Sequence, residues 1–198
     1  MAGELERRVV ELVLSLTGGT PLPTPAWLVR PGKSECGTRW PLVQRIYTGL
    51  TGGSLPEVMR PVERRTVDLV FQSRGVQPRL LEVDEKQHFN PFRSETLRAY
   101  GGRVPVSFDW KGWIARGDVK ASLEGGGFAK PRPPLFPGVN GRHKQRAFRD
   151  ALSDILPTEH GFLPTLRIAY FEVASWIFDD QATQRLARHL AALGVRLN

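Results

Sequence analysis

The sequence predicts an α/β fold, in which a central mixed β-sheet is flanked by helices, and three observations lead to this prediction. Apolar residues recur at helical spacing over residues 4–16, 143–156 and 181–193. Strand-like runs occupy residues 66–71, 80–89 and 166–173. Helices and strands therefore alternate along the chain, as they do in α/β proteins.

Length and composition limit the classes of protein that fit. The 198 residues are enough to bury a core and indicate a single domain, 1–198. The formal net charge of +8 favours a polyanionic partner, because lysine and arginine release counterions when they neutralise phosphates. One cysteine, Cys36, excludes an intramolecular disulfide. Without a secretory signal pattern or a long uncharged run, the sequence indicates a cytoplasmic protein with no membrane contact.

The first half of the chain predicts two helices and two acid-bearing strands. The helix at 4–16 ends at Gly18 and Gly19, and a loop rich in proline and glycine follows over 20–39. A second helix at 41–50 is stopped by Gly52 and Gly53, and residues 55–62 are an edge strand or an extended lead-in. A turn at 72–78 then joins the strands at 66–71 and 80–89.

The second half begins irregularly and then becomes regular. We expect a short helix at 94–100 and a strand at 104–108, followed by a segment rich in glycine and proline up to residue 134 that builds little core. The final elements are the helix at 143–156, the strand at 166–173 and the helix at 181–193.

The most informative stretch is Leu80 to Phe89, LLEVDEKQHF, where an apolar run turns into a series of ionisable residues. If it is a strand, alternation places Glu82, Asp84 and Lys86 on one face. Asp68 lies inside the preceding strand-like run. These acids predict a metal site shared by adjacent strands, although the same face is also compatible with solvated charge pairs on an edge strand.

Phosphodiester cleavage gives a chemical reason for such a site. Mg²⁺ takes oxygen ligands and is usually held by one or two carboxylates, which Asp68 and Glu82 could supply. A bound metal activates water and neutralises the leaving oxygen. Lys86, Gln87 and His88 are placed to orient or deprotonate that water, and the ordinary pKa of histidine suits proton transfer.

These motifs resemble the PD-(D/E)xK nuclease superfamily, and within it the branch of very-short-patch-repair endonucleases. Asp68 matches the first acid of the motif, and Glu82-Val83-Asp84 matches the second element, with Asp84 where many members have lysine. The run from Glu82 to His88 is similar to the acid-x-Asp-Gly-x-Gln-His pattern of that branch, with Glu85 in place of glycine. An alternative register takes Asp84-Glu85-Lys86 as the (D/E)xK element and leaves Gln87 and His88 unexplained.

The resemblance implies a restriction-endonuclease-like αβββαβ core and further site residues. The core would comprise residues 35–89 and 143–195, with residues 1–34 as an N-terminal helix and extension and residues 90–142 as a Gly/Pro-rich insertion. The family places a glutamate on a helix before the first acid strand, for which Glu35 is the first candidate and Glu6 the second. An arginine on the helix after the acid strands would bind phosphate, and Arg146 fits that place.

The insertion interleaves basic and aromatic residues, a mixture suited to phosphates and bases. We expect nucleic acid to contact Arg93, Lys111, Lys144 and Arg146. The resulting hypothesis is an endonuclease dependent on Mg²⁺ or Mn²⁺ that hydrolyses phosphodiester bonds of DNA. The alternatives are a catalytically inactive nucleic-acid-binding or interaction protein on the same fold, and a nuclease subunit of a defence or restriction complex. The chain could act as a homodimer or as a subunit of such a complex.

Overall fold

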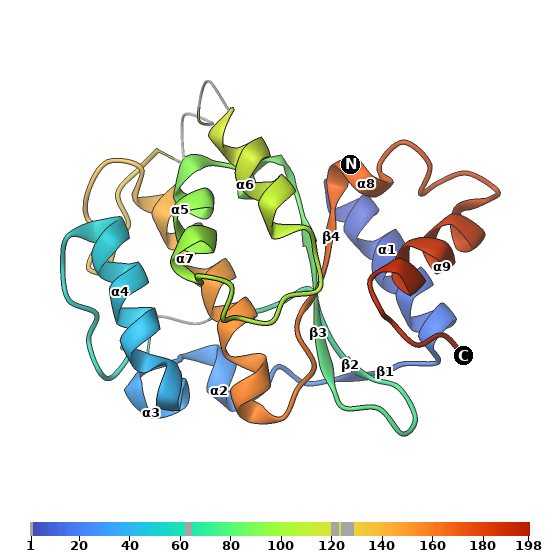
Figure 1. Ribbon diagram of the computed structural model, residues 1–198, viewed down its shortest axis with the longest axis horizontal. Helices are drawn as coiled ribbons and strands as arrows, with labels where there is room; N and C mark the ends of the chain where they lie inside the picture. Colours follow the sequence, from blue (N-terminus) through green and yellow to red (C-terminus); the bar gives the residue numbers. More distant parts are fainter. Residues whose placement is uncertain (1, 62–64, 120–122, 124–128) are drawn as a thin grey trace.

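A four-stranded mixed sheet forms the centre of the computed structural model, which describes residues 2–61, 65–119, 123 and 129–198 (Figure 1). The strands lie in the order β1 (Thr20–Leu22), β2 (Leu69–Gln72), β3 (Arg79–Asp84) and β4 (Leu166–Ala169). β1, β2 and β3 are antiparallel neighbours, whereas β4 runs parallel to β3. A mixed sheet flanked by helices is therefore present, as the sequence predicts.

Helices cover both faces of this sheet (Figure 1). One face carries α1 (Ala2–Thr17), α9 (Ala182–Ala192) and the short α8 (Tyr170–Val173). The other carries α4 (Trp40–Thr51), α5 (Pro91–Ala99), α6 (Trp110–Asp118) and α7 (Gly141–Ile155). Among the described residues there are also the short helices α2 (Ala26–Val29), α3 (Lys33–Cys36), η1 (Gly37–Arg39), η2 (Lys86–His88) and η4 (Pro157–His160). No helix in the described ranges combines the length and apolar character of a membrane span.

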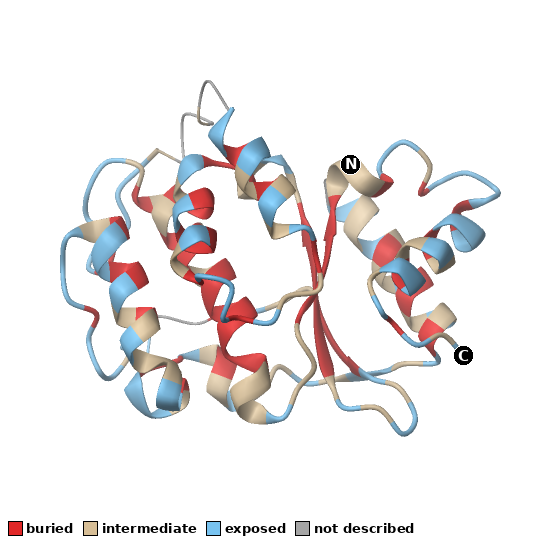
Figure 2. Ribbon diagram, viewed as in Figure 1, coloured by how far each residue is buried: buried red, intermediate tan, exposed pale blue. Residues whose placement is uncertain are grey.

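Strand alternation sends the side chains of β3 to two different environments, and all six residues of β3 are buried (Figure 2). Leu81 and Val83 join the apolar core beneath α1 and α9. Glu82 and Asp84 point to the opposite face, where α7 lies. Their carboxylates must therefore find polar partners inside the protein, because an unpaired buried charge is costly.

The predicted helices are confirmed at 4–16, 41–50, 94–100, 143–156 and 181–193, with bounds shifted by a few residues. Local signals explain several ends. Gly52 adopts the left-handed conformation that closes α4, and the Asn90 side chain caps α5 by accepting a hydrogen bond from the backbone N–H of Arg93. Periodicity was sufficient for α1, α4, α7 and α9 because each buries one apolar face, whereas α5 buries the polar residues Arg93, Ser94 and Thr96 beside Leu97.

The strand predictions need four corrections. β2 begins only at Leu69, so Asp68 precedes the strand. β3 ends at Asp84 because Lys86–His88 forms a 3₁₀ turn, so Lys86 does not continue the face of Glu82. Residues 104–108 form no strand, and the run 166–173 is a strand only to Ala169, after which the chain turns into α8. At 104–108 and after Ala169 apolar residues satisfied the strand pattern, although tertiary packing and not sheet pairing buries Val104, Phe108 and Val173.

Two segments gain structure that the sequence did not predict. The loop at 20–39 contains β1, which extends the sheet through pairing with β2. The segment after residue 108, expected to build little core, contains α6 and places Trp113 in the core that α7 also lines. The edge strand considered at 55–62 is not formed by residues 55–61. Residues 62–64 lie outside the described part of the chain. So do residues 120–122 and 124–128 of the basic and aromatic segment.

Candidate nuclease cleft

A polar cavity of about 270 Å³ lies at the point where α1, β3 and α7 meet. Acidic side chains reach it from α1 and from the sheet, and arginines reach it from α7 and from the segment before β2. The residues that line it are Glu6, Arg65, Thr66, Asp68, Glu82, Val83, Glu85, His88, Arg142, Arg146, Arg149 and Asp150. We call this cavity the acid–arginine cleft.

Asp68 and Glu82 are held in the cleft by hydrogen bonds that leave part of each carboxylate available. Oδ2 of Asp68 accepts a 2.7 Å hydrogen bond from the backbone N–H of Val83. Oε1 of Glu82 accepts one of 2.9 Å from the Ser153 hydroxyl and a longer one of 3.4 Å from Arg65. In both residues the second oxygen is therefore the one available to a cation that enters the cleft.

Ionisation of both Asp68 and Glu82 is unfavourable in the cleft. Burial raises the pKa of Asp68 to about 7, and the nearby charge of Glu82 adds to the effect. Burial also raises the pKa of Glu82, although Arg167 and Arg65 oppose the shift. Acids in a cavity that resist ionisation are typical of sites that gain a positive ligand, because a bound cation removes the repulsion.

Arg142, Arg146 and Arg149 form a row along α7 on the wall of the cleft that this helix provides, and we call them the arginine row. They lie at positions i, i+4 and i+7 of α7 and so share one face of the helix. Burial lowers the pKa of Arg142, and the neighbouring charges of Arg146 and Arg149 lower it further. Cations that repel one another in a shared cavity are stabilised by an anion such as phosphate.

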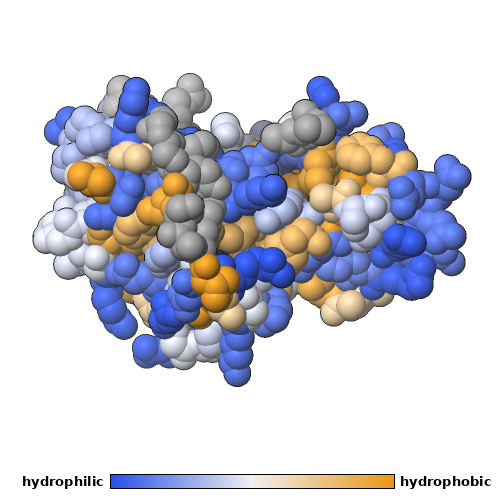
Figure 3. Space-filling view, turned by 90° about the horizontal axis from the view of Figure 1, so that it is seen from above, coloured by the Kyte–Doolittle hydropathy of each residue, from blue (hydrophilic) through white to orange (hydrophobic). Residues whose placement is uncertain are grey.

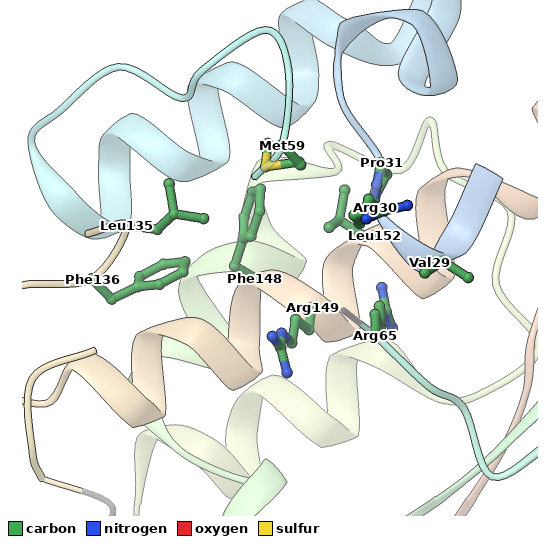
Figure 4. A pocket seen from close by; sticks show the side chains of 10 residues that line it. All are labelled: Val29, Arg30, Pro31, Met59, Arg65, Leu135, Phe136, Phe148, Arg149 and Leu152. Atoms are coloured by element: carbon green, nitrogen blue, oxygen red, sulfur yellow. The ribbon is translucent and has the colours of Figure 1, made fainter. Parts of the chain in front are cut away.

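A smaller apolar cavity of about 30 Å³ lies behind this wall (Figure 4). Arg65 and Arg149 line both cavities. Met59, Phe148 and Leu152 form much of the apolar surface behind them. The aliphatic parts of the Arg65 and Arg149 side chains can pack on this surface while their guanidinium groups line the cleft.

His88 lies between two carboxylates at the end of the cleft. Its Nδ1 is 2.9 Å from Oδ2 of Asp150 and 3.0 Å from Oδ1 of Asp84. Burial alone would lower the pKa of His88, but Asp150 and Asp84 outweigh it and raise the pKa to about 10. His88 is therefore an imidazolium at neutral pH, with Nδ1 donating to the two acids.

Behind His88, a buried network joins the sheet to α5 and α7. Arg167 of β4 is fully buried and donates to Asp84 at 2.6 Å and to Asp154 at 2.7 Å. Arg93 of α5 contacts the other oxygen of Asp154 at 2.5 Å. Asp84, Asp150 and Asp154 are thus balanced by Arg93, Arg167 and protonated His88. This balance explains why His88 holds its proton.

Asp84, His88 and Asp150 also offer ligand atoms within 4.8 Å of one another, so this cluster is a second candidate for a metal. It fits less well than the pair of Asp68 and Glu82. A divalent cation there would have to displace the proton of His88 and share Asp84 with the guanidinium of Arg167. Asp84 is moreover fully buried and does not line the cleft.

The structure brings together part of the predicted site. Asp68, Glu82, His88 and Arg146 line the cleft, and Asp84 lies immediately behind it through its contact with His88. Lys86 and Gln87 lie on the other side of η2, where Nζ of Lys86 is 5.7 Å from the centre of the Tyr170 ring and Gln87 donates to Glu85. The sharp turn after β3 separates them from His88.

Four further predicted residues lie away from the cleft. Glu35 caps its own helix by accepting a 2.8 Å hydrogen bond from the backbone N–H of Gly32. Arg93 cannot contact nucleic acid as placed, because it is buried and paired with Asp154. Lys111 is exposed on α6, and Lys144 lies with Nζ 5.5 Å from the centre of the Phe92 ring. Neither lysine lines the cleft.

The structure adds residues that sequence reasoning missed or ranked second. Glu6, the second candidate for the helical glutamate, lines the cleft in place of Glu35. Arg142 and Arg149 could have been found from their spacing with Arg146 on one helix face. Arg65, Ser153 and Asp150 carried no such signal, since they reach Glu82 and His88 from distant parts of the chain.

A comparison of the chain with protein-family models, with curated proteins and with solved structures finds no match in any of the three.

Proposed function

We propose that this protein is a divalent-metal-dependent endonuclease that hydrolyses phosphodiester bonds in DNA. The observation that carries the proposal is the two-walled cleft, in which carboxylates face a row of arginines. Carboxylates bind the metal ions of phosphoryl chemistry, whereas arginines bind phosphate. Few ligands other than a metal-bound phosphodiester satisfy both walls at once.

The order of the elements supports a restriction-endonuclease-like fold as part of this proposal. α1 and β1 are followed by α2, α3, η1 and α4, then by the antiparallel strands β2 and β3, by α5 to α7 and by the parallel β4. In this assignment the core begins with α1 and not at residue 35, and the segment from α2 to α4 is an insertion between β1 and β2. The remaining elements follow the αβββαβ order of the PD-(D/E)xK superfamily that the motifs resemble. Glu6 of α1, not Glu35, is then the glutamate of the first helix.

Asp68 and Glu82, with the backbone carbonyl of Val83, would hold Mg²⁺ or Mn²⁺. The donor set fits a hard cation, because it consists of oxygens and each carboxylate keeps one oxygen outside its fixing hydrogen bonds. When bound, the metal polarises the phosphate and lowers the pKa of a coordinated water. Glu6 and Glu85 lie in the same cavity and can accept hydrogen bonds from that water.

The arginine row would bind the phosphate of the scissile or neighbouring nucleotide. Arg142, Arg146 and Arg149 present guanidinium groups that pair bidentately with phosphate oxygens. Phosphate contacts of this kind position a strand without reading its sequence. The arginine row therefore accounts for binding but predicts no sequence preference.

His88 would act as a general acid. Asp84 and Asp150 fix Nδ1 and keep the ring protonated, which leaves the N–H of Nε2 as the proton to be given to the leaving oxygen. Asp84 is then a positioning residue, stabilised by Arg167. This role would explain why Asp84 stands where many members of the PD-(D/E)xK superfamily have lysine.

A plasmid-nicking assay tests the proposal. Cleavage of supercoiled DNA should require Mg²⁺ or Mn²⁺ and stop in EDTA. Asp68→Asn and Glu82→Gln should each reduce the rate by about 100-fold or more, since losing even a partner of a metal ligand commonly costs 10- to 100-fold. Glu11→Gln is the control, because Glu11 is an exposed carboxylate on α1 that pairs with Arg8 outside the cleft.

Metal binding is measured separately by thermal unfolding. Mg²⁺ should raise the melting temperature of the wild type and of Glu11→Gln, but not that of Asp68→Asn. Metal-independent cleavage, or cleavage that survives both site substitutions, would refute the proposal. DNA binding without cleavage or metal stabilisation would instead favour the catalytically inactive binding protein.

A further inference from the structure

A second and larger groove, of about 800 Å³, lies beside the acid–arginine cleft. We call it the aromatic groove. It is lined by Glu4, Leu5, Glu85, Lys86, Gln87, Tyr170, Ala174 and Phe178. Figure 3 views the molecule from the end where α8 lies and shows hydrophobic residues gathered over the half that contains α1 and α8. The volume is in the range of sites that bind small organic molecules.

The aromatic groove and the cleft share one dividing wall. The first turns of α1 give Glu6 to the cleft but Glu4 and Leu5 to the groove. The turn after β3 gives His88 to the cleft and Lys86 to the groove, and Glu85 lines both. A ligand with two chemically different parts can therefore occupy both sites across this wall.

The groove presents aromatic surface that is already fixed in place. The Tyr170 ring packs edge-on against Phe89 and Phe171, with ring centres 6.1 and 5.5 Å away. Phe178 keeps 56% of its surface exposed to solvent. The held Tyr170 ring and the exposed Phe178 ring suit the flat face of a nucleobase, which stacks on aromatic rings with little dependence on its identity.

The charges of the groove decide which part of a nucleotide can enter. Two carboxylates, Glu4 and Glu85, and one ammonium group, Lys86, lie in its lining and give it a net negative charge that disfavours a phosphate. The arginine row of the cleft attracts one. A carboxylate can accept hydrogen bonds from the amino group of a base. The backbone is thus favoured in the cleft and the uncharged base in the groove.

We infer that the aromatic groove binds an unpaired nucleobase of the strand whose phosphate lies in the acid–arginine cleft. The inference rests on the proposed function, because it takes the cleft to be the phosphate site. It adds that the substrate presents an unstacked base next to the cleaved bond, as single strands, loops and frayed ends do. Tyr170 and Phe178 are the stacking surfaces, and Nζ of Lys86 lies 5.7 Å from the centre of the Tyr170 ring.

The test compares two single-stranded oligonucleotides of about eight nucleotides, within the usual length of a single-strand site. One carries all its bases, and the other has the same sugar-phosphate backbone with every base removed. Both carry the same phosphate charge, so the ratio of their dissociation constants reports the bases alone. The full-length chain carries Glu82→Gln in every measurement, so that the strand is bound but not cut.

In this background we expect the strand with bases to bind more tightly by fivefold or more. Phe178→Ala should reduce this ratio by at least fivefold, since removal of one stacking ring costs about that much. Ala174→Trp should reduce the ratio as well, because Ala174 lines the groove and a large side chain there would fill it. Val139→Ala is the matched control, an exposed apolar residue that lines neither cavity.

The outcomes separate the groove from the nuclease. An unchanged ratio in both Phe178→Ala and Ala174→Trp, with melting temperatures like that of the parent, overturns the groove even if the wild type cuts DNA. A reduced ratio in both variants but not in Val139→Ala supports the groove even if no cleavage is found. Failure of the parent to bind either strand overturns the groove together with the phosphate site.

Discussion

Arg167→Met removes a buried guanidinium group that contacts three buried aspartates. Arg167 is fully buried and donates to Asp84 at 2.6 Å and to Asp154 at 2.7 Å. It also donates to the backbone carbonyl of Asp150 at 3.1 Å and lies 3.8 Å from its carboxylate. Methionine fills much of the same volume but supplies no charge and no donors.

The loss can be estimated from these contacts. Removal of one partner of a buried ion pair costs about 3–5 kcal/mol, because the remaining charge stays buried without compensation. A protein of this size is stabilised by roughly 5–15 kcal/mol in total. With a urea dependence of about 2 kcal/mol per molar, the unfolding midpoint should fall by about 2 M. Arg167→Met is therefore expected to consume a large part of the stability.

The assay is urea unfolding followed by tryptophan fluorescence, since the core contains Trp113. Arg185→Met is the matched control, because Arg185 is partly exposed and lies 4.0 Å from Asp179. An exposed pair of this kind should contribute less than about 1 kcal/mol. Arg167→Lys keeps the charge but loses the planar fork that reaches both Asp84 and Asp154, so it should rank between the two.

The pH dependence gives a second check. Burial would raise the pKa of Asp84, but Arg167 and His88 outweigh it and hold the folded pKa below its ordinary value of 3.8. A lowered folded pKa contributes stability above the unfolded pKa that is lost as the pH falls through the folded value. The difference in unfolding free energy between wild type and Arg167→Met should thus become smaller below about pH 4. A loss at pH 7 no larger than that of Arg185→Met would refute this account of the network.

Three further outcomes are expected. Burial raises the folded pKa of Asp68 to about 7, above its ordinary value of 3.8, so the metal-free wild type should lose stability as the pH rises from about 4 to about 7. Melting temperatures measured across this pH range should fall less steeply in Asp68→Asn, or in wild type with Mg²⁺, than in metal-free wild type. An equal fall in these three samples would contradict the raised pKa. Arg146→Gln should weaken DNA binding and lower the slope of log affinity against log salt by about 0.7–0.9, whereas exposed Arg185→Gln should leave the slope unchanged. Gly141→Ala should destabilise the protein by about 1–3 kcal/mol in urea unfolding, because a Cβ there would lie 2.3 Å from the carbonyl oxygen of Phe136 at the start of α7; Gly138→Ala, where nothing lies within 4 Å, should be nearly neutral.

The long amphipathic helices were predictable because their signal is local. α1, α4, α7 and α9 each bury one stripe of apolar residues, and that stripe appears in the sequence at helical spacing. The strands were less predictable. Runs of apolar residues also mark segments that are buried without pairing, as at 104–108, and the short β1 carries too few residues to be recognised.

The sequence by itself indicated that Asp68 and Glu82 would lie near each other, since Asp68 comes directly before β2, Glu82 lies on the paired β3, and alternation points Glu82 away from Leu81 and Val83. It also indicated His88 as a site residue. It could not decide the roles of Asp84 and Arg93, which depend on Arg167 and Asp154 from the second half of the chain. Only the tertiary structure decided that Asp84 pairs with an arginine behind the cleft, and that Glu6 rather than Glu35 enters it. The physical reason is that a buried charge takes its partner from whichever element packs beside it, and that neighbour is set by the fold and not by distance along the chain.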